Sequence, residues 1–89
     1  MTVFKVLDDA RQDWYFIGSN LGCKDSDLYE IRSRNPSDKR MCLLEMLQRR
    51  IQQGGLTRSM LCNSLRGELV PRDDIARKIE EVLPLPTHN

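Results

Sequence analysis

The 89-residue sequence is poor in the residues from which active sites and metal sites are usually built. It contains a single histidine, His88, close to its end, and three cysteines without a CxxC pair. Nucleophilic catalysis needs a base beside its serine or cysteine, and a structural zinc site needs about four ligands at close spacing. The sequence also has no phosphate-binding glycine loop. We therefore expect no enzyme activity, no metal and no cofactor.

The cysteines Cys23, Cys42 and Cys62 are odd in number and widely spaced, which favours reduced and partly buried thiols over a disulfide framework. Long apolar runs are missing as well. The first residues read "MTVFKVLDDARQ", where charges interrupt each apolar stretch. We expect neither a signal peptide nor a membrane-inserted segment in this chain, and a cytoplasmic location.

The chain also lacks an excess of either charge, because 14 basic and 13 acidic side chains give a net charge of +1. Such a balance gives no overall field that attracts nucleic acid or anionic membranes. Glycine and proline are few, with five and four residues, and 39% of the chain is hydrophobic. This composition is typical of an ordinary globular chain, and its length indicates one domain.

Apolar residues recur at helical spacing along most of the chain, and no stretch alternates with the period of two expected of a strand. We therefore expect an all-α fold. Gly54 and Gly55 are expected to end the longest helix, and Thr57 is a candidate cap of the helix after it. The expected helices cover residues 3–17, 25–34, 38–53, 57–67 and 71–83, with room for a short extra helix at 35–40. The first of them is expected to bend near Gln12.

The only tryptophan, Trp14, stands near the end of the first expected helix, shortly before Gly18 and Gly22. We interpret it as a core residue rather than part of a site, because a side chain of this size at an apolar helical position is usually buried. Its expected neighbours are Ile17, Leu21, Leu28 and Ile31.

Charges of opposite sign are segregated along the middle of the sequence. Ordinary solvated helix faces are the simplest explanation of such runs. The alternative is a bipolar module, in which opposite patches on different faces join copies head to tail. The candidate partner-binding residues are the acids Asp25, Asp27 and Glu30, the bases Arg32, Arg34, Lys39 and Arg40, and the later pair Arg49 and Arg50.

The order of these features resembles the death domain. The matching positions are Trp14, Ile17-Gly18, Leu21-Gly22, Asp27-Leu28, Ile31, Leu44, Met46-Leu47, Thr57, Leu61, Leu65, Asp74-Ile75-Ala76 and Ile79. The resemblance covers residues 3–83 and leaves 84–89 as a flexible tail. It implies an antiparallel six-helix bundle with the Greek-key arrangement of the death fold. It also implies non-catalytic, homotypic binding to other death-domain proteins in apoptotic or innate-immune and inflammatory signalling.

One position departs from the family pattern. Death domains commonly carry a second tryptophan toward the end of the fourth helix, where this sequence has Arg50. We expect that corner of the core to be packed by Ile51 and Trp14, or lined by the aliphatic stem of Arg50. The related death effector domain has an Arg-x-Asp-Leu motif similar to "RDDI" at 72–75, but Trp14 fits the death domain alone. The caspase-recruitment domain is a third relative without a distinguishing mark here.

Two other functions are compatible with a small all-α chain. The segment "GGLTRSMLCNSLRG" has the turn and polar helix of a helix-turn-helix DNA reader, but its basic residues are only Arg58 and Arg66. A symmetric dimerisation bundle is the second alternative.

Overall fold

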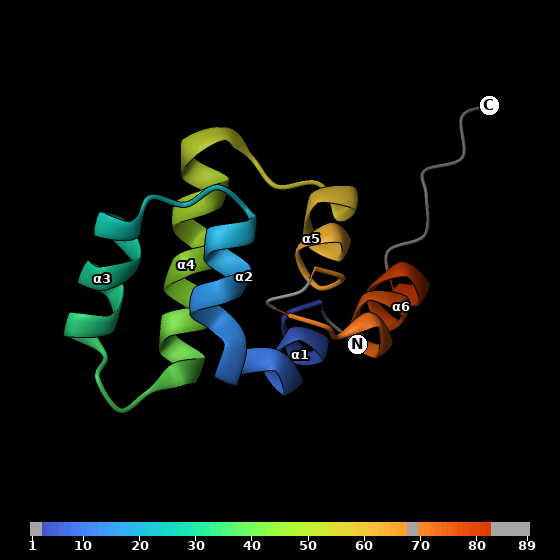
Figure 1. Ribbon diagram of the computed structural model, residues 1–89, viewed down its shortest axis with the longest axis horizontal. Helices are drawn as coiled ribbons and strands as arrows, with labels where there is room; N and C mark the ends of the chain where they lie inside the picture. The colour runs from blue at the N-terminus through green and yellow to red at the C-terminus, as the bar shows by residue number, and fades with distance from the viewer. Residues whose placement is uncertain (1–2, 68–69, 83–89) are drawn as a thin grey trace.

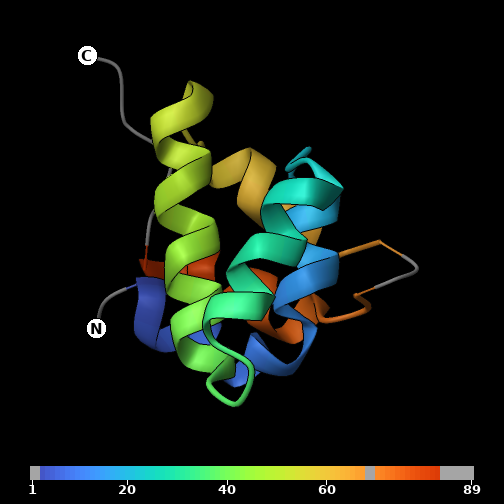
Figure 2. The same cartoon turned by 90° about the vertical axis from the view of Figure 1, so that its left-hand side faces the viewer.

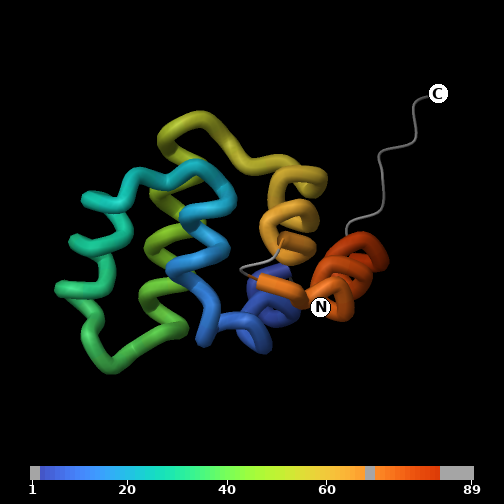
Figure 3. Tube along the Cα trace, viewed as in Figure 1, coloured from blue at the N-terminus to red at the C-terminus, as the bar shows by residue number. Residues whose placement is uncertain are grey.

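The computed structural model describes residues 3–67 and 70–82, and these residues form an all-α fold with no strand element. Figure 1 shows α2, α3 and α4 gathered at one end of the molecule and α1, α5 and α6 at the other. The same path can be followed in the trace of Figure 3. The elements are α1 (Val3–Leu7), the 3₁₀ helix η1 (Asp8–Asp13), α2 (Trp14–Asn20), α3 (Asp25–Arg34), α4 (Lys39–Gly54), α5 (Arg58–Ser64) and α6 (Asp73–Val82).

The helix expected over 3–17 is divided in two, and the break lies slightly before the bend expected near Gln12. The α-helical path ends after Leu7, continues as η1 and contains non-helical backbone at Ala10, with φ −105° and ψ 15°. The physical reason is that the two halves pack on different partners, α1 against α6 and α2 against α3, α4 and α5. With this break, Val6 on α1 and Trp14 on α2 are both buried in the core.

The short extra helix expected at 35–40 is also wrong. Residues 36 and 37 form a turn, and α4 begins at Lys39. The side chain of Asp38 accepts a hydrogen bond from the backbone N–H of Met41 at 3.0 Å, which caps α4 at this point. Farther along, α5 ends at Ser64, so the expected helix over 57–67 is shorter than predicted. The tail expected at 84–89 and Leu83 lie outside the described residues.

Trp14 belongs to the core, as the sequence predicted, with only 4% of its surface exposed. Ile17, Leu28 and Ile31 are buried in the same cluster, together with Leu21. Figure 2 shows α4 running along the side of α2 and α3, the helices that carry these residues. The core therefore extends across α2, α3 and α4 at this end of the fold.

Gly18 permits the close approach of three helices. A methyl group added there would lie 2.6 Å from Leu28 Cδ2 on α3 and 2.9 Å from Met46 Cγ on α4. The position therefore has room for glycine and for nothing larger without movement of two buried side chains.

Cys23, Cys42 and Cys62 are free and buried, in agreement with the prediction of reduced thiols. Burial is the main cause that raises the pKa of each thiol. These cysteines serve as small core residues, and their reactivity is low because the thiolate form is disfavoured.

Candidate interaction surface

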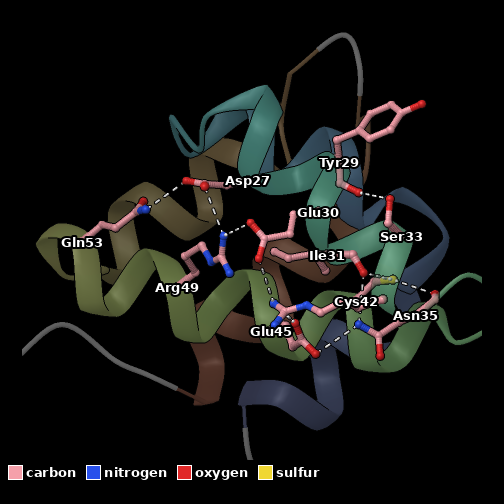
Figure 4. A network of polar contacts seen from close by, with 11 residues as sticks. Asp27, Tyr29, Glu30, Ile31, Ser33, Asn35, Cys42, Glu45, Arg49 and Gln53 are labelled. Carbon is pink, nitrogen blue, oxygen red and sulfur yellow. Dashed lines mark hydrogen bonds and ion pairs between the residues drawn. The ribbon is translucent and has the colours of Figure 1, made fainter.

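An ion-pair network joins the first turns of α3 to the end of α4 (Figure 4). Arg49 Nη1 lies 3.1 Å from Asp27 Oδ1 and 3.5 Å from Glu30 Oε2. Gln53 Nε2, one turn after Arg49 on α4, donates to Asp27 Oδ2 at 3.0 Å. Asp27 and Glu30 are three residues apart on α3 and therefore share the side that faces α4.

This network corrects one part of the bipolar hypothesis. The sequence suggested that Asp27 and Glu30 lie on a different face from Arg49, whereas the structure brings the three together as partners. Arg49 lies 22 positions after Asp27 and 19 after Glu30, so only the packing of α3 on α4 brings it to the two acids. The binding of a partner by these residues stays a prediction.

The pairing changes the acidity of Asp27. Its pKa is lowered, mainly by the hydrogen bond from Gln53 and then by the positive charge of Arg49, against an opposing effect of desolvation. The pKa of Arg49 is raised, chiefly by its hydrogen bond to Glu30. Both groups are therefore held in their charged forms at neutral pH.

A second group of polar contacts fastens the end of α3 to the middle of α4. Arg34 Nη2 donates to Glu45 Oε2 at 2.8 Å and lies 3.9 Å from Glu30 Oε1. Asn35 Nδ2 donates to the other Glu45 oxygen at 3.1 Å. With Arg49, these residues give a polar border along one side of α4 (Figure 4).

Beside this border, the exposed side of α4 carries a shallow groove of about 380 Å³. Met41 is 38% exposed there, and Leu44 is half-buried. The groove thus combines apolar surface with paired charges. We refer to it as the α4 groove, and its lining residues are Arg34, Met41, Leu44, Glu45, Gln48, Arg49 and Gln52.

Two of the predicted bases lie elsewhere, at the start of α4. Arg40 donates to both carboxylate oxygens of Asp8, from Nε at 3.1 Å and from Nη2 at 2.7 Å. Lys39 Nζ donates to Gln12 Oε1 at 2.6 Å. The hydrogen bond from Arg40 is the largest cause that lowers the pKa of Asp8. Both bases therefore hold α4 to η1, in addition to any contact with a partner.

Arg32, the remaining predicted base of α3, lies among aromatic rings. Its guanidinium carbon is 4.7 Å from the ring centre of Tyr29 and 5.4 Å from that of Tyr15, distances typical of cation–π contacts. Phe16 extends this row, with its ring centre 6.4 Å from that of Tyr15. We refer to these four residues as the aromatic face.

The aromatic face was not predicted from the sequence. Tyr29 is 60% exposed and Phe16 is 44% exposed. The sequence did carry a signal for this exposure. Tyr29 follows Leu28 and Phe16 precedes Ile17, and both neighbours belong to the buried stripe. Adjacent residues point to different sides of a helix, so the two rings must point away from the core. Asp25 is also exposed, in the first turn of α3.

Next to the position that departs from the family pattern, Ile51 is 56% exposed, so the alternative in which Ile51 and Trp14 pack that corner of the core is wrong for Ile51. That the aliphatic stem of Arg50 lines the core stays a prediction. Arg50 is half-buried, and its Nε atom is buried with no hydrogen-bond partner among the residues described. Residues 50 and 51 differ by about 100° around the helix, which is why one turns inward and the other outward.

The helix-turn-helix reading gains no support from the basic residues of α5 and its surroundings. Arg66 Nε lies 2.6 Å from Asp73 Oδ1, and its Nη2 lies 2.6 Å from Glu80 Oε1. The helix-turn-helix hypothesis needs Arg66 to bind a phosphate. Its guanidinium already binds two carboxylates of α6.

Within residues 3–67 and 70–82, no helix is long and apolar enough to cross a membrane. The same residues contain no group of three or more histidine, cysteine, aspartate or glutamate side chains arranged to hold a metal ion.

No protein-family model, no curated protein and no solved structure matches this chain. The geometry of its surfaces is therefore the basis on which a function is proposed.

Proposed function

We propose that residues 3–83 form a death domain that acts as a non-catalytic, homotypic interaction module in apoptotic or innate-immune signalling. The observation that carries this proposal is the α4 groove, where Met41 and Leu44 lie beside the ion-paired Arg34 and Arg49. Specific protein interfaces likewise combine apolar contacts with polar groups, and arginine is enriched among their main contacts.

The order of the helices supports the death-fold part of the proposal. Among the described residues, the helices follow in the order expected from the sequence, with the first of them divided by η1 into α1 and α2. Contact of α1 with α6 brings the two ends of this sequence of helices together. Trp14 is buried at the start of α2, among residues that carry the resemblance.

The exposed charged residues are suited to the rim of a protein interface. Exposed charges mainly set the rate of encounter and the choice of partner, whereas truncation of a desolvated pair costs about 2 to 5 kcal/mol. Arg34 and Glu30 have side chains that are 53% and 55% exposed, so both can meet a partner while retaining their internal contacts. Reversal of Arg34, Asp27 or Arg40 would also break an ion pair within the chain, so the control reversal must break one as well.

The proposal is tested by binding of the purified chain to a panel of purified death domains, with helical bundles of other families as negative controls. We expect binding to at least one death domain and none to the control bundles. Reversal variants Arg34→Glu and Asp27→Arg should remove this binding while the protein stays folded by circular dichroism. Arg77→Glu on α6 is the matched control, since the Arg77 side chain is 74% exposed and lies on another helix.

A duplex titration at low salt distinguishes the nucleic-acid alternative. We expect no binding to duplex DNA. Binding that weakens steeply as salt rises would contradict the proposal, because that dependence reports release of counterions from phosphates. Unchanged death-domain binding by both reversal variants would refute the assignment of the surface.

A further inference from the structure

The exposed apolar surface of the chain is concentrated in two places. Among residues 3–67 and 70–82, four large hydrophobic side chains are exposed: Phe16, Tyr29, Met41 and Ile51. Phe16 and Tyr29 belong to the aromatic face, and Met41 and Ile51 lie along α4. Single exposed apolar residues are common, but their concentration in two patches indicates binding surfaces.

The aromatic face is a connected surface rather than two separate rings. Arg32 stacks on both tyrosines, and Tyr15 contacts Phe16 edge to face, with an interplanar angle of 77°. Rings held in this way lose little conformational freedom when a partner covers them, which favours their use as anchors. Asp25 lies four residues before Tyr29 on α3 and gives the same side of the helix an exposed carboxylate.

Three apolar side chains of α4, Met41, Leu44 and Ile51, lie along one side of the helix, with the polar Gln48 between the last two. These positions are spaced by three or four residues, and the stripe from 41 to 51 is about 15 Å long. Methionine sulfur and arginine guanidinium both interact favourably with aromatic rings. The α4 groove supplies one methionine and two arginines, so its chemistry complements that of the aromatic face.

The charges of the two surfaces are also complementary, because each surface carries groups of a sign that the other can bind. The α4 groove is lined by Arg34 and Arg49 and by one acid, Glu45. Asp25, one turn before Tyr29 on α3, offers a carboxylate to the arginines, and Arg32 of the aromatic face offers its guanidinium to the acid. Contact between unlike faces therefore brings opposite charges together, whereas two copies of the α4 groove placed face to face would bring arginines together.

The two surfaces point in different directions on one molecule. Figure 4 shows Tyr29 projecting from α3 away from α4, whereas Glu45 and Arg49 lie on α4 at the other side of α3. One molecule therefore cannot join its own two surfaces, and a second copy can occupy either of them.

From these observations we propose that the aromatic face of one copy binds the α4 groove of a second copy. The inference rests on the proposed function, for which it names the partner and both surfaces. Because the contact is between unlike surfaces, a dimer leaves one aromatic face and one α4 groove open, and association continues beyond the dimer.

The test is a complementation experiment in sedimentation equilibrium with two variants. One carries Phe16→Ala and Tyr29→Ala, and the other carries Met41→Lys and Gln48→Lys. All four side chains are exposed, so both proteins should fold. The matched control carries Lys78→Ala and Glu81→Ala, two exposed residues of another groove, between α1 and α6. Circular dichroism and thermal melting establish folding, and the single variants Tyr29→Ala and Met41→Lys replace any double variant that fails to fold.

We expect the average mass of the wild-type chain to rise with concentration beyond that of a dimer, and the control to behave likewise. Each variant alone should associate at least ten-fold more weakly. An equimolar mixture of the two variants should form a heterodimer and stop there, because each supplies the surface that the other lacks.

Three results would overturn the inference. They are a wild-type chain that stays monomeric, a mixture no more associated than its components, and variants that associate as strongly as the wild type. In the third case the chain still binds itself, so the proposed function stands and only the surfaces are wrong. In the first case, the death-domain panel decides separately whether the proposed function also fails.

Discussion

Arg49 on α4 and Asp27 on α3 form an ion pair, with 3.1 Å between Nη1 and Oδ1. Their side chains are 24% and 21% exposed, so the pair is only partly open to solvent. It connects two helices whose outer surfaces we assign to partner binding. The geometry of the proposed interface therefore depends on contacts within the chain as well as on the residues that meet a partner.

The pKa of Asp27 lies below the usual value, mainly because Gln53 donates a hydrogen bond to the carboxylate. Replacing Gln53 with alanine should raise that pKa toward the unperturbed value of about 3.9. The carboxyl chemical shift of Asp27, followed by NMR during an acid titration, measures the change, and Gln52→Ala is the matched control. An unchanged titration in Gln53→Ala would contradict the assigned contact.

The same group makes stability depend on pH. Because the pKa of Asp27 is lower in the folded chain than in the unfolded one, its contribution is fully present above about pH 4 and is lost as the pH falls through the lowered value. In Asp27→Asn this component should be absent, so the free energy of unfolding should depend less on pH below about 4. Urea denaturation between pH 2 and 7 tests this, with Asp25→Asn as control. Equal pH dependence in Asp27→Asn and the wild type would refute it.

Trp14 should be the most costly single side chain to truncate. It is 4% exposed, and substitution of a buried tryptophan by alanine destabilises a protein by about 3 to 5 kcal/mol. Urea denaturation of Trp14→Ala measures this loss. Phe16→Ala, two residues away and exposed, should have a much smaller effect. Near-native stability of Trp14→Ala would show that the residue is not part of the core.

Gly18→Ala should destabilise the fold although alanine is the better helix former. The added methyl group would meet Leu28 Cδ2 at 2.6 Å and Met46 Cγ at 2.9 Å, and overpacking of this kind costs about 1 to 3 kcal/mol. Ser19→Ala, at an exposed position of the same helix, is the control. A stabilised Gly18→Ala protein would mean that α2 lies farther from α3 and α4 than described.

The pair of Arg40 and Asp8 should behave as a structural contact. Arg40→Glu places two acids opposite each other and should lower the melting temperature, whereas the double variant Asp8→Arg with Arg40→Glu restores opposite charges and should recover part of the loss. Thermal melting at low and high salt measures both. Absence of recovery in the double variant would indicate that Arg40 acts independently of Asp8.

Features specified by neighbouring residues were predictable from the sequence. The helix expected over 38–53 is observed as α4, Lys39–Gly54, and Gly55, with φ of 83°, follows it in the left-handed region that favours glycine. Thr57 caps α5 by accepting from the N–H of Met60 at 3.1 Å, as predicted. These signals act within a few residues and do not depend on the rest of the fold.

Features that depend on packing between distant segments were not predictable in the same way. The apolar stripe over 3–17 continues through the break at η1. The sequence alone therefore does not show that α1 packs on α6 while α2 packs on α4. Asp27 and Arg49 are 22 positions apart, and their pairing likewise depends on how α3 packs on α4. The outward direction of Ile51 depends on which side of α4 the other helices cover.

The central claim is that this chain is an interaction module that uses the α4 groove and the aromatic face. An NMR dilution series of the uniformly labelled chain tests it most directly, by the change of backbone amide shifts with concentration. We expect progressive shifts around Met41, Leu44, Tyr29 and Phe16, and little change at Lys78 and Glu81. Shifts that do not change with concentration, or that change only along α1 and α6, would contradict it.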